Sequence, residues 1–273
     1  MKRLLLVLIL CAPAWAANDF TSDPNCKLLY RFESGALTAD SKGTSTLTAV
    51  ASPTADTTNY KEGAASTYMD DASSQYYSVA DSGLGSGVPF KSDVNDFEFT
   101  ITLWWRSEST NYGAGFDPIW AKGANVHLYT YNNFGTGRIV IQLAFEHGET
   151  PSVSHDGTGL YDFDTWYFTA VSYNRTTRAV RIYWANPDGS EHGTTAESVM
   201  SGAYLTLEGN SSAFEIGHST PYSAVHEFDG RVDEFVMFDK ALSQDDVNDI
   251  RDGLYPSSTT TSTSDWWWRR RHN

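Results

Sequence analysis

Residues 97–106 read FEFTITLWWR, and this run decides the fold class. Apolar side chains stand at every odd position, whereas polar side chains, Glu98 and Arg106 among them, stand at even positions. Because successive side chains of a β-strand point to opposite faces of its sheet, the alternation predicts a strand with one face in a core. Trp104 interrupts the polar side and places a large indole ring on the face away from the core.

Other stretches of the chain have the same character. Turn sequences rich in Gly, Asn, Asp and Pro separate them. The further predicted strands cover residues 126–131, 137–146, 166–174, 178–185, 213–217 and 230–238. Strands of this length and spacing predict an all-β chain folded as a two-sheet sandwich or jelly roll. One helix is expected after Ser243, which is a favourable N-cap residue, with Val247, Ile250 and Leu254 on one face.

The first 16 residues predict a secretory signal peptide. Lys2 and Arg3 precede a short apolar run, and Ala14-Trp15-Ala16 offers small residues at both positions that a signal peptidase inspects. The apolar run is far shorter than the roughly 20 residues that a membrane-spanning helix needs. We therefore expect a secreted protein, extracellular or on the cell surface, without a transmembrane segment.

The rest of the chain divides at Pro256. Residues 17–255 carry all the predicted strands and form the expected folded domain. Residues 256–273 begin with a run of Ser and Thr, which predicts a disordered linker, and continue into a tail with three Trp and three Arg residues. This tail either meets an anionic interface or serves as a sorting address, or it has no role.

Composition limits the partners of the chain. Its 273 residues carry a formal net charge of −15, which repels phosphate backbones and argues against nucleic acid. The same charge favours divalent cations, neutral sugars or basic protein surfaces, although it also serves solubility. Cys26 is the only cysteine beyond the predicted leader, so the domain has neither an internal disulfide nor a cysteine-based zinc site.

Residues 230–243, GRVDEFVMFDKALS, resemble the closing signature of LamG-like domains of the concanavalin A-like lectin/glucanase superfamily. Residues 29–33 followed by Ala39-Asp40-Ser41 resemble that family's first strand and loop, and residues 166–173 with 180–183 resemble its central hairpin. The resemblance covers residues 19–255 and implies a concanavalin A-like jelly-roll β-sandwich with one short C-terminal helix. Members include lectin-like modules, adhesion domains and appendages of hydrolases, so the fold does not name the ligand.

The resemblance also implies a structural calcium ion. Related jelly rolls often tie the N-terminal segment to the last strand through such an ion, and the matching positions are Asp40 and Asp233, with Glu33 as a further ligand. Carboxylate oxygens suit Ca²⁺, which takes six to eight hard oxygen ligands. In the alternative, Asp233 caps a turn or pairs with an arginine.

The strand positions that face away from the core form a second candidate site. These side chains are both aromatic and polar, which suits a sugar, because C–H groups lie against flat rings while hydroxyls meet polar atoms. The expected ligand-binding residues are Trp104, Arg106, His127, Tyr129, Tyr131, Gln142 and Glu146. In the alternative, a helix or loop covers these aromatics as a second small core. Trp120 and Trp184 are expected in the main core.

No catalytic residue is assigned. Glu227, Asp229 and Asp233 lie close in sequence, but Val232 stands where the Glu-x-Asp-x-x-Glu pattern of laminarinase relatives would need its last Glu. A lyase would instead use the histidine, tyrosine, glutamine and arginine of the outward face. The predicted function is therefore non-catalytic binding of a polysaccharide or glycosylated surface. The alternatives are a polysaccharide-cleaving enzyme, either hydrolase or lyase, and a structural or adhesive subunit that contacts protein.

Overall fold

The alternation at the start of the sequence analysis is realised in strand β6 (Phe99–Ser107). The computed structural model describes residues 18–108, 117–123, 126–133, 136–143, 152–156, 161–192, 195–200, 206–220 and 227–255. The predicted signal peptide, residues 1–16, and the predicted linker and tail, residues 256–273, lie outside the described residues. Within the described part of the chain, no helix is long and apolar enough to cross a membrane.

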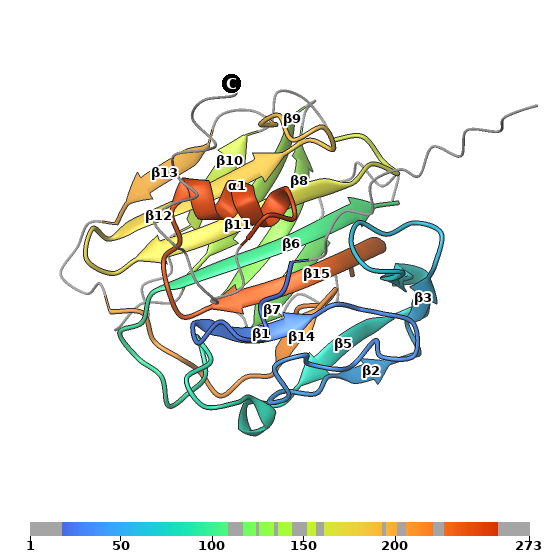
Figure 1. Ribbon diagram of the computed structural model, residues 1–273, viewed down its shortest axis with the longest axis horizontal. Coiled ribbons are helices and arrows are strands. Elements are labelled where there is room, and N and C mark those ends of the chain that lie inside the picture. Colours follow the sequence, from blue (N-terminus) through green and yellow to red (C-terminus); the bar gives the residue numbers. More distant parts are fainter. Residues whose placement is uncertain are drawn as a thin grey trace, which may run out of the picture.

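Two antiparallel sheets lie face to face, with one helix outside them (Figure 1). The eight-stranded sheet has, in spatial order, β13 (Ala196–Val199), β12 (Ala179–Ala185), β11 (Tyr167–Asn174), β6, β15 (Gly230–Phe238), β4 (Ser66–Met69) and β3 (Thr54–Asp56), with β1 (Cys26–Tyr30) also paired to β15. The predicted all-β concanavalin A-like jelly-roll sandwich with one short helix is confirmed.

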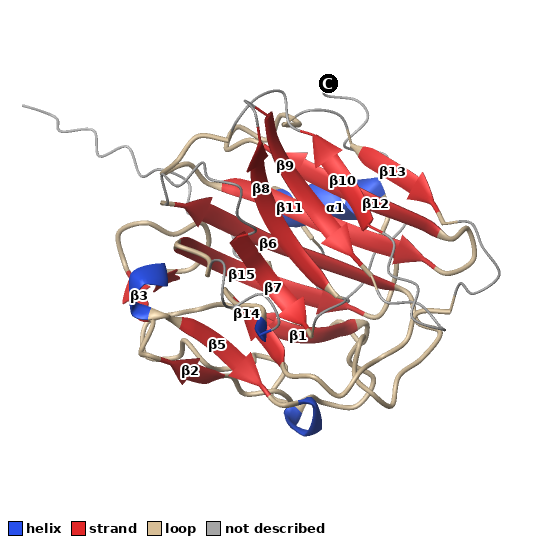
Figure 2. Ribbon diagram, turned by 180° about the vertical axis from the view of Figure 1, so that it is seen from behind, coloured by secondary structure: helices blue, strands red, loops and turns tan. Residues whose placement is uncertain are grey.

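The seven-stranded sheet forms the other layer and is nearer the viewer in Figure 2. Its order is β10 (Ser152–Asp156), β9 (Thr136–Gln142), β8 (His127–Asn133), β7 (Asp117–Lys122), β14 (Phe214–Ile216), β5 (Tyr76–Val79) and β2 (Thr48–Val50). Two short 3₁₀ helices, η1 (Asp71–Ser73) and η2 (Asp81–Gly83), lie in the loops.

The main core fills the space between the sheets. Phe99, Ile101, Leu103 and Trp105 of β6 all belong to it, as their odd positions predict. Trp120 and Trp184 are also fully buried in this core, as expected.

Helix α1 (Gln244–Arg251) lies over the outer face of the eight-stranded sheet (Figure 1). Ser243 begins it with a capping box: its hydroxyl accepts from the Asp246 N–H, and the Asp246 side chain accepts from the Ser243 N–H. Val247 and Ile250 face the sheet and close a second, smaller core that also contains Trp104. The alternative expectation, in which a helix covers the outward aromatics, is therefore correct for this sheet.

Candidate functional site

The predicted ligand-binding residues divide between the two sheets. Trp104 and Arg106 belong to β6, whereas His127, Tyr129 and Tyr131 belong to β8 and Gln142 to β9. The outer faces of stacked sheets point in opposite directions, so the expectation of one shared surface is wrong. The physical reason is that alternation separates core from surface along each strand but carries no information on which sheet the strand joins. Glu146 lies outside the described residues.

On the seven-stranded sheet, part of the predicted face is assembled. His127 pairs directly with Gln142 on one side and Ala121 on the other, and Ala121 pairs with Glu215. These side chains lie in one row across the outer face, because their strand neighbours point into the core. The rings of His127 and Tyr129 lie 5.1 Å apart. Tyr131 shares this strand, but its side chain is not among the described features.

Glu215 is not among the predicted site residues, although residues 213–217 are predicted as a strand. The alternation of Phe214, Glu215 and Ile216 separates Glu215 from the core, but it does not reveal that β14 pairs with β7 and so brings Glu215 into the row of His127. Its carboxylate accepts from the N–H (2.9 Å) and hydroxyl (2.6 Å) of Thr220, and His218 Nδ1 lies 3.2 Å away. Burial alone would raise the pKa of Glu215. The contacts with His218 and Thr220 lower the pKa by more than burial raises it, so the net shift is downward. The His218 ring stacks on Tyr76 at 4.1 Å, and Glu227 lies 3.8 Å from its Nε2.

The three carboxylates considered for hydrolysis have different surroundings. Glu227 lies beside His218, Asp229 lies beside Asp70 and Asp71, and Asp233 holds the loop between β3 and β4 of its own sheet. Retaining glycosidases need two carboxyl groups about 5 Å apart and facing one substrate. The distribution of these residues gives no support for that arrangement.

Trp104 lies in a pocket on the other side of the molecule, on the outer face of the eight-stranded sheet beside α1. The pocket has a volume of about 430 Å³. Three chain segments line it around Trp104: Tyr60, Lys61 and Glu62; Pro187, Asp188 and Gly189; and Arg251, Asp252 and Gly253. Trp104 itself is 5% exposed, and the Lys61 Nζ lies 4.1 Å from the centroid of its ring. Tyr60 is 41% exposed and presents the most accessible aromatic ring of the lining.

Arg106 does not line this pocket. It lies further along β6, where its Nη2 donates to Asp164 over 3.0 Å and lies 3.7 Å from Glu108. Arg231 of β15 is its direct cross-strand neighbour and pairs with Asp56 and Glu108. Arg106 is thus part of a charge network at the end of the sheet.

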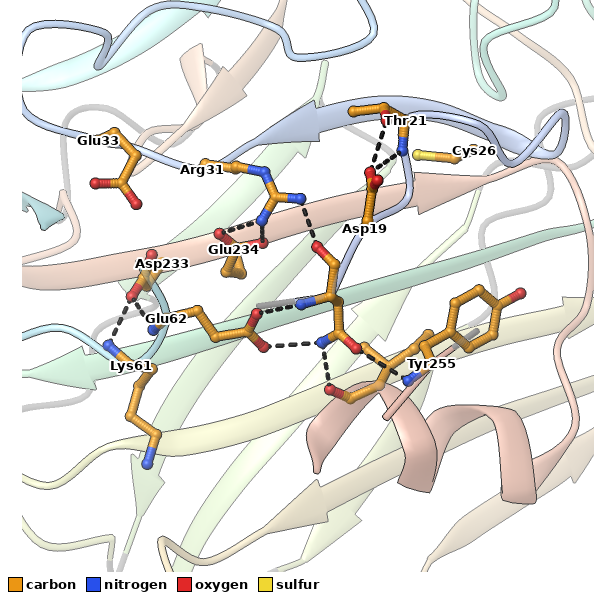
Figure 3. A network of polar contacts seen from close by, with 12 residues as sticks. Asp19, Thr21, Cys26, Arg31, Glu33, Lys61, Glu62, Asp233, Glu234 and Tyr255 are labelled. Carbon is orange, nitrogen blue, oxygen red and sulfur yellow. Dashed lines mark hydrogen bonds and ion pairs between the residues drawn. The ribbon is translucent and has the colours of Figure 1, made fainter. Parts of the chain in front are cut away.

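Two of the three predicted calcium ligands hold the same loop. The Asp233 Oδ2 accepts from the N–H groups of Lys61 (2.7 Å) and Glu62 (3.2 Å), and both Glu33 oxygens accept from the Ala64 N–H at 3.1 Å. Figure 3 shows Asp233 and Glu33 in this region. A Cβ at Gly63 would lie 1.5 Å from a Glu33 oxygen, so any other residue here would displace the Glu33 carboxylate from its bond to Ala64, and the φ of +67° favours glycine as well.

One carboxylate oxygen of Asp233 is available as a ligand for a cation. It is 0% exposed, and its Oδ1 has no hydrogen-bond partner. A buried, unpartnered carboxylate oxygen is costly unless a cation or donor meets it. Glu33 and Asp233 are hard oxygen donors, which is the ligand type that Ca²⁺ takes. The donor chemistry of these two residues is thus compatible with a calcium ion.

Asp40 does not fit it. Its Oδ1 accepts from the N–H groups of Leu29 and Lys42, and its Oδ2 accepts from Thr44 N–H, Thr44 Oγ1 and Ser45 N–H. Five donors occupy both oxygens, so this carboxylate organises its own loop. The prediction of Asp40 as a calcium ligand is not supported by this geometry, and its oxygens do not join those of Glu33 and Asp233 in one close group.

An ion-pair network continues from this loop to the first described residue (Figure 3). Arg31 Nη1 donates to both oxygens of Glu234 at 3.1 Å, and its Nη2 donates to the Asn18 carbonyl. Glu62 accepts from the backbone and side-chain nitrogens of Asn18. Burial raises the pKa of Glu62, Asp233 and Glu234. Arginine pairing thus falls to Glu234 and not to Asp233. Asp233 instead accepts from the N–H groups of Lys61 and Glu62 at a turn, which agrees with the alternative that it caps a turn.

A separate acidic cluster lies between η1 and the start of β15. Single oxygens of Asp70, Asp71 and Asp229 lie within 4.8 Å of one another, the one such group among the described residues. Burial and the two neighbouring carboxylates raise the pKa of Asp229 to about 6, and burial with Asp71 and Asp229 raises that of Asp117 to about 7. No spacing in the sequence predicts this cluster, because Asp229 precedes β15 and is far along the chain from Asp70 and Asp71.

Comparison with known proteins agrees with this architecture. The family model described as "Concanavalin A-like lectin/glucanases superfamily" matches residues 71–248. No curated protein matches the chain. Domain 4 of AbnA, a GH43 extracellular arabinanase from Geobacillus stearothermophilus solved in complex with arabinotriose, is 16% identical with a TM-score of 0.56, over 83% of this chain and 98% of that one.

Toxin domains share the fold as well. The binding domain of botulinum neurotoxin serotype D is 14% identical, with a TM-score of 0.61 over 84% of this chain and 52% of that one. The binding domain of botulinum neurotoxin DC in complex with SialylT is 13% identical, with a TM-score of 0.57 over 86% of this chain and 52% of that one. The chain thus spans about half the length of these toxin domains, and identities this low establish the fold alone.

Proposed function

This chain belongs to the concanavalin A-like lectin/glucanase superfamily, and on that premise we propose that it is an exported, non-catalytic domain that binds carbohydrate. The ligand is a polysaccharide or the glycan of a cell surface, and the binding site is the pocket beside Trp104.

The pocket is the observation that carries this proposal. Its volume of about 430 Å³ falls within the roughly 300–1,000 Å³ of common ligand sites. The exposed ring of Tyr60 offers a flat surface for the C–H face of a sugar ring, and the ammonium of Lys61 lies where a sugar oxygen can accept from it. Loops from three distant parts of the chain meet here, which is typical of binding sites on rigid β-scaffolds.

The fold neighbours support the same class of ligand. One was solved with arabinotriose and another with SialylT. Those ligands belong to those proteins, and here they favour a sugar over other small molecules.

We further propose that calcium binds at Asp233 and Glu33. When bound, the ion supplies positive charge to a region whose buried carboxylates outnumber its cations. Both residues hold the loop at residues 60–64, and that loop carries Tyr60 and Lys61 into the pocket. Calcium removal should therefore weaken sugar binding as well as the fold.

Retention on immobilised and insoluble polysaccharides tests the proposal. The wild-type protein is compared with Tyr60→Ala, with and without EDTA, and with the control Val199→Ala, which removes an even more exposed apolar side chain outside the pocket. Retention that Tyr60→Ala abolishes and Val199→Ala preserves supports the site. Absence of retention on every polysaccharide contradicts carbohydrate binding.

A second candidate, polysaccharide cleavage, is favoured by the row on the seven-stranded sheet that brings together Glu215, His127 and Gln142. The row contains an imidazole and a carboxylate, which are group types that general acid–base chemistry uses. Incubation with the same polysaccharides, followed by measurement of new reducing ends and of absorbance from unsaturated uronates, decides the matter. Product formation that His127→Ala abolishes would establish the enzyme.

A further inference from the structure

The ammonium group of Lys61 has an unusual position in the pocket. Its backbone N–H is held by Asp233, and its side chain extends away from that carboxylate (Figure 3) to lie over Trp104. Among the described residues, no acceptor lies within hydrogen-bond distance of its Nζ. The half-buried ammonium faces the pocket over an aromatic ring and has no hydrogen-bonding anion among the described residues, so it is free to bind one.

The carboxylates that line the pocket are already engaged. Glu62 receives hydrogen bonds on Oε1 (2.9 Å) and Oε2 (3.1 Å) from Asn18. Asp252 receives them on Oδ1 (2.7 Å) and Oδ2 (3.0 Å) from Arg251. The Oδ1 of Asp188 accepts from the N–H and hydroxyl of Ser190. Each of these carboxylates thus bonds to its own neighbours, and none of these bonds involves the Lys61 Nζ.

Arg251, the other cation of the lining, is also engaged. Besides Asp252 it donates to the Gly189 carbonyl over 2.9 Å and to the Tyr183 hydroxyl. Its guanidinium is thus used to join the end of α1 to the loop at residues 187–189. Lys61 is the charged side chain of the lining that retains capacity to bind an anion.

We propose that the pocket selects an acidic sugar, one that bears a carboxylate or a sulfate ester, and that Lys61 is the residue that recognises this group. The inference rests on the proposed function and adds the class of sugar to it. The Trp104 ring beneath the ammonium keeps the cation at the pocket wall, and Tyr60 of the same loop receives the sugar ring. The net charge of −15 repels polyanions at long range, so selection for an acidic ligand must come from this local contact.

Paired oligosaccharides test the inference by titration calorimetry. Oligogalacturonate is compared with its carboxyl-reduced form, and a sulfated galactan oligosaccharide with its desulfated form, so that each pair differs only in the acidic group. We expect the wild-type protein to bind at least one acidic form at least tenfold more tightly than its neutral partner. The pair that shows the preference identifies the carboxylate or the sulfate as the recognised group.

Substitutions at Lys61 assign the preference to this residue. Lys61→Met keeps an unbranched stem over Trp104 and removes the charge, so the tenfold preference should disappear, whereas Lys61→Arg keeps the charge and should retain most of it. Lys240→Met, an exposed lysine outside the pocket lining, should leave the preference unchanged. Melting temperatures confirm that each variant is folded.

Two results would overturn the inference alone. One is equal affinity for acidic and neutral partners that Tyr60→Ala still weakens, since this leaves carbohydrate binding at the pocket intact. The other is an acidic preference that Lys61→Met does not alter. Failure to bind any oligosaccharide would instead overturn the proposed function and, with it, the inference.

Discussion

The carboxylate of Asp233 holds the backbone of Lys61: the Lys61 N–H donates to the Asp233 Oδ2 over 2.7 Å, across 172 residues of sequence. Asp233 lies within β15, in the middle of the eight-stranded sheet, and Lys61 belongs to the loop that forms one wall of the pocket. Strand β15 thus positions the loop that brings Tyr60 and Lys61 to the pocket. The Oδ1 of the same carboxylate has no hydrogen-bond partner and is the atom proposed to bind calcium, so one side chain serves both the pocket loop and the ion.

Calcium removal should lower the melting temperature of the wild-type protein, and added calcium should restore it. The reason is that a ligand bound only to the folded state stabilises that state by mass action. Asp233→Asn should abolish the response to calcium. Asp71→Asn, in the separate acidic cluster, serves as the control and should keep it. A melting temperature that is the same in EDTA and in calcium would refute the ion.

Gly63→Ala should destabilise the fold more than Gly43→Ala does. Both glycines have positive φ angles, +67° and +77°, so both substitutions carry a similar backbone cost of about 1 kcal/mol. Only at Gly63 does the added Cβ also meet the Glu33 carboxylate; at Gly43 nothing lies within 4 Å. Urea unfolding measures both changes. Equal losses would mean that the contact between Glu33 and the loop has no structural importance.

Trp104→Ala should reduce the free energy of unfolding by about 3–5 kcal/mol, the usual cost of truncating a buried large aromatic side chain. Trp104 is 5% exposed and packs on Phe168 with ring centroids 5.2 Å apart, beneath α1. Loss of sugar binding in this variant would therefore be ambiguous, which is why Tyr60 is the better probe of the pocket. Chemical denaturation checks the prediction, and a change below about 1 kcal/mol would contradict the buried position.

Asp117→Asn should stabilise the protein increasingly as the pH rises. In the folded chain the pKa of Asp117 is raised from 3.8 to about 7 by burial and by Asp71 and Asp229. The folded state therefore binds this proton more tightly than the unfolded state, and the free energy of unfolding falls as the pH rises from about 4 to about 7. The amide cannot ionise and escapes this loss.

Melting curves in EDTA between pH 5 and pH 8 measure the effect without interference from cations. The advantage of Asp117→Asn over the wild type should grow across this interval. Asp93→Asn, at an exposed carboxylate, should give a profile parallel to the wild type. A constant difference for Asp117→Asn would show that this group has an ordinary pKa in the folded protein.

Local signals in the sequence predicted the helix and the longer strands, but not β2, β3, β4, β5, β7, β10 and β13, which have at most six residues each and show too little periodicity. The alternation at residues 97–106 predicts which side chains of β6 enter the main core, and Ser243 marks the start of α1. The position of Asp40 before a polar turn is also a local signal: short side chains of this kind commonly bind nearby backbone N–H groups, as Asp40 does. The family resemblance assigned it to calcium instead.

Relationships between distant segments could not be predicted in this way. Trp104 and His127 have the same outward pattern, but strand pairing places them on opposite sheets. Tyr60 and Lys61 lie in a loop without periodic character, and only the contact with Asp233 brings them to the pocket. Sequence reasoning therefore found Trp104 but not the side chains that make its surroundings a pocket.

The central claim is that the pocket beside Trp104 binds carbohydrate. The most direct test measures how tightly one soluble oligosaccharide binds to the wild-type protein and to two variants. The oligosaccharide is prepared from a polysaccharide that retains the protein. Titration calorimetry should give an affinity that Tyr60→Ala weakens at least tenfold and that Val199→Ala leaves unchanged. Equal affinity of Tyr60→Ala and wild-type protein would contradict the claim and would place the sugar on another surface of the molecule.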